Sequence, residues 1–238
     1  MTVQPTLCAP GQARGTDRPV AGALLWQVDQ LADGVHRILP DLSRDMLWDG
    51  PLPVVLPPTT VRLLLPAVRG TRTVGVRLPI GATGVRIAPT WPGWLLDDPN
   101  DPEERLDRLA RAVAEKALTW VVPEDRDRIV RDLDLPGTRM PSVAARHFRS
   151  ERSLRRTSTA WFGLPPGKMA QVLRLWRFAG ALRQVRVARA AAEAGYTDQS
   201  HAHREVRALT GLTPGQLASW TENSFWTGGD NAFRTVRG

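Results

Sequence analysis

The chain has 238 residues, 42% hydrophobic and 24% charged, so it is long enough to bury a core and to form one or two domains. It contains no run of about 18 apolar residues and no N-terminal signal peptide, which favours a soluble cytoplasmic protein without a membrane partner. The single cysteine, Cys8, can form neither an internal disulfide nor a metal site alone, so no metal and no cofactor are expected.

The basic residues are concentrated in the C-terminal part of the chain. Pro136 to Gly238 contains 16 Lys plus Arg against 6 Asp plus Glu, a charge of +10. The remainder has 16 against 18, or −2, and the two parts sum to the +8 of the whole chain. Because the chain is also rich in Ala, Gly and Pro, as GC-rich coding would give, the preference for arginine over lysine carries little weight. The uneven distribution of charge indicates that the C-terminal part binds phosphates.

The N-terminal part predicts a tail followed by a β-rich domain. Residues 1–20 are poor in apolar side chains and predict a disordered tail. Residues 21–97 contain short apolar runs separated by Pro and Gly, which predicts a compact β-rich domain that senses a ligand or dimerises. The predicted strands are Ala23–Val28, Val35–Leu39, Val61–Leu65, Val74–Leu78 and Val85–Ile87.

Some side chains of this domain could form a site, although structural explanations are favoured. His36, Asp41 and Asp45 lack the spacing of a metal or acid–base site, and we interpret them as polar loop residues. The four tryptophans could line an apolar pocket, but packing is the better explanation. They are Trp26, Trp48, Trp91 and Trp94.

After residue 97 the pattern becomes helical. Within a connecting segment, 98–122, an amphipathic helix is predicted over Pro102–Trp120 because acids occupy its first turn and apolar residues share one face. That face contains Leu106, Leu109, Val113 and Ala117. A second helix is predicted over Glu124–Leu133. Residues 123–220 form a helical domain, and residues 221–238 are predicted to be a loosely held tail.

A helix-turn-helix pattern follows Val187. A short helix, Val187–Ala194, ends at Gly195, which can adopt the left-handed conformation, and Asp198 then stands at the N-cap of a second helix. This second helix has Ala202, Val206 and Leu209 on its inner face, and Ser200, His201 and Arg204 on another face. Such a unit places its second helix in the major groove of DNA.

An earlier stretch repeats the pattern, and one helix connects the two. Ser150 is a good N-cap for a helix that turns Leu154, Ser158 and Trp161 inward, and three arginines outward. The connecting helix, Lys168–Arg183, turns Val172, Leu175, Trp176 and Ala179 inward. Its length of about 24 Å suits a spacer between recognition helices about 34 Å apart, one DNA turn.

The complete pattern resembles the AraC/XylS family of transcription regulators. The resemblance covers residues 123–220 and is carried by GYTDQSHAHREVRALTGLTP at 195–214 and SERSLRR at 150–156. Upstream, LLWQVD, HRILPDLSRDMLWDG and VGVRLPIGATG resemble an uncharacterised N-terminal domain of some AraC-like regulators. The resemblance implies an α+β protein, in which a β-rich N-terminal domain precedes an all-α domain of seven helices with two helix-turn-helix units joined by a linker helix.

The resemblance also implies DNA-contacting positions. They are Arg152, Arg155 and Arg156 in the first unit, and Gln199, Ser200, His201 and Arg204 in the second. Arginine pairs with guanine and glutamine with adenine, which fits this assignment. The first unit departs from the family at its turn, where Phe148 and Arg149 replace glycine and an aliphatic residue. The family usually has a large aromatic residue where this chain has Ser158 and Val206, and often has one where this chain has Ala202. We therefore expect the second unit to dominate sequence discrimination.

These features favour a sequence-specific transcriptional regulator that binds double-stranded promoter DNA, with no catalytic residues. A small-molecule effector, RNA polymerase and a second copy of the chain remain open as partners. Two other functions also remain open: an interaction module with weakened DNA reading, and a DNA-targeted enzyme with its chemistry in the N-terminal domain. The DNA-repair chemistry of some AraC-like proteins needs a metal-held cysteine, a role for which Cys8 is poorly placed.

Overall fold

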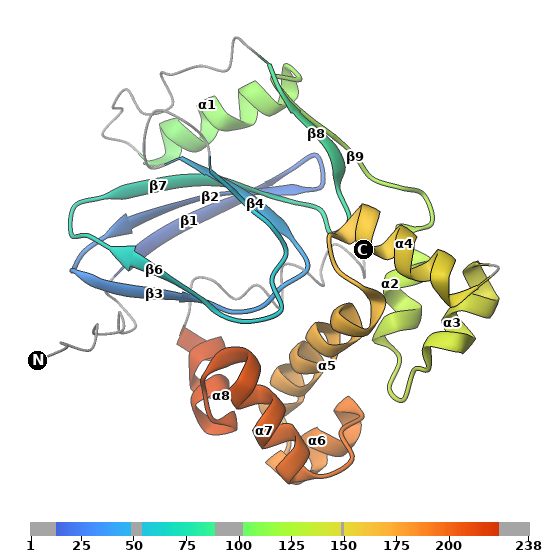
Figure 1. Cartoon of the computed structure of the whole chain (residues 1–238). Helices are drawn as coiled ribbons and strands as arrows, with labels where there is room; N and C mark the ends of the chain where they lie inside the picture. Colours follow the sequence, from blue (N-terminus) through green and yellow to red (C-terminus); the bar gives the residue numbers. More distant parts are fainter. Residues whose placement is uncertain (1–12, 49–53, 89–101, 149, 224–238) are drawn as a thin grey trace, which may run out of the picture. The chain divides into compact units, whose positions relative to one another are not determined.

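The computed structural model describes residues 13–48, 54–88, 102–148 and 150–223, which form a β-rich part followed by a helical part (Figure 1). The chain divides into two compact units. The β unit comprises Met1–Arg37, Ser43–Pro57 and Leu64–Pro123. The helical unit comprises Ile38–Leu42, Pro58–Leu63 and Glu124–Gly238. The predicted fold class, β-rich and then all-α, is confirmed.

The β unit is built on a five-stranded sheet with the order β1-β2-β7-β4-β5, in which neighbouring strands run antiparallel. Two further pairs, β3 with β6 and β8 with β9, complete the strands of the described residues. The strands are β1 (Ala13–Val20), β2 (Ala23–Gln30), β3 (Gly34–Ile38), β4 (Arg44–Trp48), β5 (Val54–Leu56), β6 (Leu63–Ala67), β7 (Arg72–Leu78), β8 (Thr83–Ile87) and β9 (Leu118–Val121).

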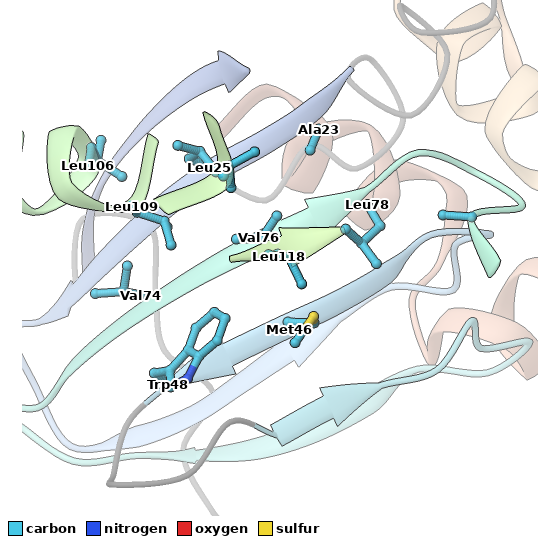
Figure 2. Packing of buried hydrophobic residues seen from close by; sticks show 12 residues of the cluster. Ala23, Leu25, Met46, Trp48, Val74, Val76, Leu78, Leu106, Leu109 and Leu118 are labelled. Carbon is cyan, nitrogen blue, oxygen red and sulfur yellow. The ribbon is translucent and has the colours of Figure 1, made fainter. Parts of the chain in front are cut away.

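One face of the five-stranded sheet packs against helix α1 (Pro102–Ala114). Leu25, Val76 and Met46 stand opposite one another across β2, β7 and β4, so their side chains point to the same face. Figure 2 shows these residues in one cluster with Leu106 and Leu109 of α1. All five side chains are 0–1% exposed. This layer of helix on sheet is the main core of the β unit.

The opposite face of the sheet holds a buried ion pair. Asp45 on β4 and Arg77 on β7 are direct cross-strand partners. The carboxylate of Asp45 accepts hydrogen bonds from Arg77 at 3.0 Å and 2.8 Å, and from the indole N–H of Trp26 at 3.3 Å. The indole of Trp26 lies against Gly75, where an added Cβ would come within 2.2 Å of the ring. This face therefore combines a buried charge pair with an aromatic ring that only glycine accommodates.

The prediction of a disordered tail over residues 1–20 is wrong for Ala13–Val20, while residues 1–12 lie outside the described part. Strand β1 pairs with β2 along its full length. The two strands meet at Ala21 and Gly22, both with positive φ, as in the tight turns that suit hairpins. Because β1 is an edge strand, it tolerates Pro19, and backbone pairing fixes it despite its polar composition.

The predicted helix over Pro102–Trp120 is also partly wrong, because α1 ends at Ala114. Lys116 has a left-handed φ of 60°, and the N–H of Ala117 donates to the carbonyl of Ala112, which closes the helix end. Leu118–Val121 then forms β9 and pairs with β8. The β-branched and aromatic side chains of LTWV favour a strand.

The helical unit contains seven helices in the described residues, as the resemblance implied. They are α2 (Arg126–Asp134), α3 (Met140–His147), α4 (Glu151–Phe162), α5 (Pro166–Leu182), α6 (Val187–Ala194), α7 (Gln199–Thr210) and α8 (Pro214–Asn223). Helix α5 buries the four side chains predicted to point inward, and also Met169, Leu173 and Phe178. Among the described residues, none of the helices has both the length and the apolarity that a membrane crossing requires.

Two short segments from the first half of the sequence belong to the helical unit. In Ile38–Leu42, Leu39 and Leu42 are buried, and the carbonyl of Pro40 accepts a 2.8 Å hydrogen bond from the indole of Trp176. In Pro58–Leu63, the backbone N–H of Arg62 donates to the carbonyl of Leu209 at 2.7 Å. The helical unit is therefore discontinuous in the sequence, whereas the predicted boundaries placed both segments within residues 21–97.

Candidate nucleic-acid interface

The second helix-turn-helix unit consists of α6, a tight turn and α7. Gly195 ends α6 with φ 85°, the left-handed conformation that the sequence predicted. A Cβ at this position would also lie 3.3 Å from the backbone nitrogen of Gly137, so both conformation and packing favour glycine. Asp198 caps α7 as predicted, because its carboxylate accepts a 2.6 Å hydrogen bond from the N–H of His201.

Helix α7 has a buried face and an exposed face. Ala202, Val206 and Leu209 are buried, as predicted. Of the positions that the resemblance assigns to DNA contact, Gln199, Ser200 and Arg204 are exposed. His201 is half-buried, with its ring edge-on to Tyr196 at 5.3 Å between centroids. The structure thus brings these four positions together on the first half of one helix.

The first unit consists of α3, a different kind of turn, and α4. Its turn passes through Phe148 in an extended conformation, φ −141°, and Arg149 lies outside the described residues. The hydroxyl of Ser150 accepts a hydrogen bond from the N–H of Ser153 at 3.2 Å, which confirms the predicted N-cap. The three arginines of α4 assigned to DNA contact are all exposed: Arg152, Arg155 and Arg156.

The inner face of α4 differs from the prediction in one residue. Leu154 and Ser158 are buried, but Trp161 is only half-buried, and Phe162 takes the inward position with 0% exposure. Residues 154, 158 and 162 follow the four-residue spacing of one helix face, and Trp161 lies at the margin of that face, about 20° from Leu154. The buried hydroxyl of Ser158 finds no hydrogen-bond partner among the described residues. This face is therefore less well satisfied than that of α7.

Helix α5 connects the two units through polar side chains that the sequence analysis did not single out. Arg177 pairs with Asp134 at the end of α2 at 2.5 Å and donates to the carbonyl of Ala194, the last residue of α6, at 3.0 Å. Arg174 pairs with Glu205 on α7 at 2.6 Å. The sequence contains one hint of this pair, because Glu205 is the only acidic residue of α7.

Tyr196, in the turn between α6 and α7, packs beside these polar groups. Its ring meets Phe178 edge-on at 5.4 Å between centroids, and the guanidinium of Arg174 lies 4.9 Å from the centre of the same ring. Burial raises the pKa of the Tyr196 hydroxyl, and Glu205 adds to the increase. The phenol therefore stays neutral and leaves Glu205 to balance the charge of Arg174.

The N-cap of α7 gives a first testable prediction. Replacing Asp198 with alanine is expected to destabilise the helical unit by about 0.5–2 kcal/mol, because the N–H of His201 loses its acceptor. Asp198→Asn is the control, since it keeps an acceptor oxygen. Chemical denaturation of the three proteins gives the comparison. Equal losses for both substitutions would show that the cap is not the cause.

The residues considered as a site in the β unit have structural partners. His36 contacts the side chain of Gln30, and burial lowers the pKa of His36. Asp45 belongs to the ion pair with Arg77, and Trp26 and Trp48 are buried. Asp41 lies in the helical unit, where its carbonyl accepts from the N–H of Thr59. Cys8, Trp91 and Trp94 lie outside the described residues.

In the comparison with known proteins, one protein family matches part of the chain. A family described as a helix-turn-helix domain matches residues 143–219, the span from α3 to α8. No curated protein matches the chain. The family match therefore covers both helix-turn-helix units and does not extend over the β unit.

Several solved structures of ToxT from Vibrio cholerae show a distant likeness. One covers 87% of this chain and 98% of ToxT, with 8% identity and a TM-score of 0.44. A second, from strain O395, covers 87% and 97%, with 9% identity and a TM-score of 0.42. A third contains ToxT bound to (E)-4-(8-methylnaphthalen-1-yl)but-3-enoic acid and covers 87% and 98%, with 9% identity and a TM-score of 0.40.

Proposed function

We propose that the chain is a DNA-binding transcriptional regulator of the AraC/XylS type, in which α7 reads bases and α4 mainly binds phosphates. The helix-turn-helix family match over residues 143–219 supports this proposal. The observation that carries the proposal is the pair of capped helices on either side of α5, each with a buried inner face and exposed polar side chains. Two recognition helices on one rigid connection suit a bipartite promoter site.

The chemistry of α7 favours direct reading of base edges. Gln199, Ser200 and Arg204 are exposed together, and His201 lies at the margin of the buried face. In the major groove, Arg204 can donate two hydrogen bonds to guanine, and Gln199 can pair with adenine. The N-cap and the left-handed glycine fix the start of this helix, which is the end that recognition helices present to the bases.

The chemistry of α4 favours contacts with the DNA backbone. Arg152, Arg155 and Arg156 present three guanidinium groups on an exposed surface. The preceding turn lacks a left-handed glycine, and Ser158 is buried without a partner among the described residues, so less in the packing fixes the depth of α4. We therefore expect these arginines to contact phosphates, which orient a protein on DNA without reading its sequence.

For the β unit we propose a regulatory role, either effector sensing or dimerisation. It has a core of its own between α1 and the five-stranded sheet, so it can fold around a separate task. Strand β5 is an edge of that sheet and exposes Val54 and Val55, which supports pairing with a second copy. A small-molecule effector of the β unit and RNA polymerase as a partner of the helical unit complete the proposal.

Point substitutions test whether α7 reads bases and α4 binds phosphates. We expect Arg204→Ala to cost about 1–3 kcal/mol of binding energy and to relax the preference at one or two base pairs. Arg155→Ala and Arg156→Ala should weaken binding to every sequence alike, because they remove phosphate contacts. The measurement is binding of each intact variant to a selected site and to its single-base variants. The ranking is reversed if Arg156→Ala removes discrimination at one base while Arg204→Ala lowers affinity uniformly.

A further inference from the structure

One acidic side chain of α7, Glu205, faces α5 and also lies beside His201, whose Nε2 is 3.8 Å from the Glu205 carboxylate. Glu205 has a side chain that is 10% exposed. Its two carboxylate oxygens accept hydrogen bonds from the guanidinium of Arg174 at 2.6–3.0 Å and from the amide of Gln171 at 3.2 Å. Both donors belong to α5, so this one acid connects the recognition helix to the linker helix.

The donors are held on one face of α5. Gln171 and Arg174 are three residues apart, which places them side by side on a helix. The guanidinium of Arg174 also lies 4.9 Å from the centre of the Tyr196 ring, in the turn that precedes α7. Arg174 therefore contacts both the turn and the helix of the second unit.

The apolar contacts of α7 come mainly from small side chains, so a polar contact can add to what fixes its rotation. Two of its inward side chains, Ala202 and Val206, are small, so each buries less apolar surface than a large side chain would. A forked arginine–carboxylate contact has a strict geometry. Since each residue turns a helix by about 100°, a contact that fixes Glu205 also fixes the direction of the adjacent Arg204.

We propose that Glu205 is a positioning residue for DNA reading, which acts through Arg174 to set the rotation of α7 in the groove and itself touches no base. This inference rests on the proposed function and deepens it, because it names the contact that aims Arg204. The guanidinium also balances the carboxylate, which would otherwise repel the phosphates beside the bound helix.

Three variants of the intact chain test the proposal. Glu205→Gln removes the charge, Arg174→Lys keeps the charge but loses the fork, and the double variant Glu205→Arg with Arg174→Glu exchanges the partners. The control is Glu193→Gln, which breaks an exposed pair with Arg189 on α6 and changes the charge equally. The measured quantity is the ratio of affinities for a selected site and for a scrambled duplex.

We expect Glu205→Gln and Arg174→Lys each to reduce that ratio roughly tenfold, within the coupling found for contacting pairs. Affinity for the scrambled duplex should change by less than about threefold, because the phosphate contacts remain. The exchanged pair should recover part of the ratio, and Glu193→Gln should leave it unchanged.

Hydrogen exchange of the unbound proteins provides a measurement that does not need DNA. Glu205→Gln should speed exchange of the amides of α7 but not of α4, and unchanged exchange in α7 would overturn the proposal even if the wild type recognises no site. An unchanged affinity ratio in a wild type that does recognise a site would also overturn it. The proposal would also be overturned if Glu205→Gln removed the preference at a single base pair while Arg174→Lys kept it, since Glu205 would then read that base directly. Absence of any sequence preference in the wild type would instead contradict the proposed function.

Discussion

Raising the salt concentration from about 50 to about 200 mM is expected to weaken binding of the intact chain to DNA by roughly a thousandfold or more, the loss typical of six or more phosphate contacts. Helices α4 and α7 expose five arginines, and α6 with the segment that precedes it exposes three more. They are Arg152, Arg155, Arg156, Arg204, Arg207, Arg183, Arg186 and Arg189. Each one that contacts a phosphate releases condensed counterions, so the affinity falls steeply with salt.

The slope of log affinity against log salt gives the number of phosphate contacts. Arg155→Ala should reduce the slope by about 0.9, the contribution of one contact. The control is Arg69→Ala, an exposed arginine of the β unit, which should leave the slope unchanged. A slope near zero for the wild type would show that its positive charge does not act on DNA.

Replacing Asp45 with alanine is expected to destabilise the β unit by about 3–5 kcal/mol, the usual cost of removing one partner of a buried ion pair. The side chains of Asp45 and Arg77 are each 8% exposed, so water can do little to replace the lost carboxylate. The substitution also removes the acceptor that Asp45 provides for the indole of Trp26. The free energy of unfolding, measured with a denaturant, gives the loss.

The double variant Asp45→Leu with Arg77→Met separates the ion pair from ordinary packing. Because both charges are replaced by apolar groups of similar size, it should cost much less than Asp45→Ala alone. If the double variant is the less stable protein, the volume of the side chains, and not an unbalanced charge, determines the stability at this position.

The features that the sequence predicted correctly depend on residues close together in the chain. Ser150 and Asp198 cap the N–H three residues later, and Gly195 ends its own helix, so the residue types reveal the structure. The buried face of α5 follows from its helical spacing in the same way. These elements define most of the candidate interface, although which side chains contact DNA remains a prediction.

The features that the sequence did not predict depend on distant partners. Strand β1 has a polar sequence and is fixed by pairing with β2, and β9 exists because β8 is beside it. Glu205 and Arg174 are 31 positions apart, so no local pattern connects them. A helical or alternating period describes which face a residue occupies, but it does not identify the partner on the opposite element.

The discontinuity of the helical unit limits how this protein can be divided. A truncation at residue 123 would keep every helix from α2 to α8, yet it would delete Ile38–Leu42 and Pro58–Leu63. Trp176 would lose the carbonyl of Pro40, and the last turn of α7 would lose the N–H of Arg62. A single cut therefore does not release the complete helical unit, and a fusion that transfers this unit to another protein would have to supply both segments again.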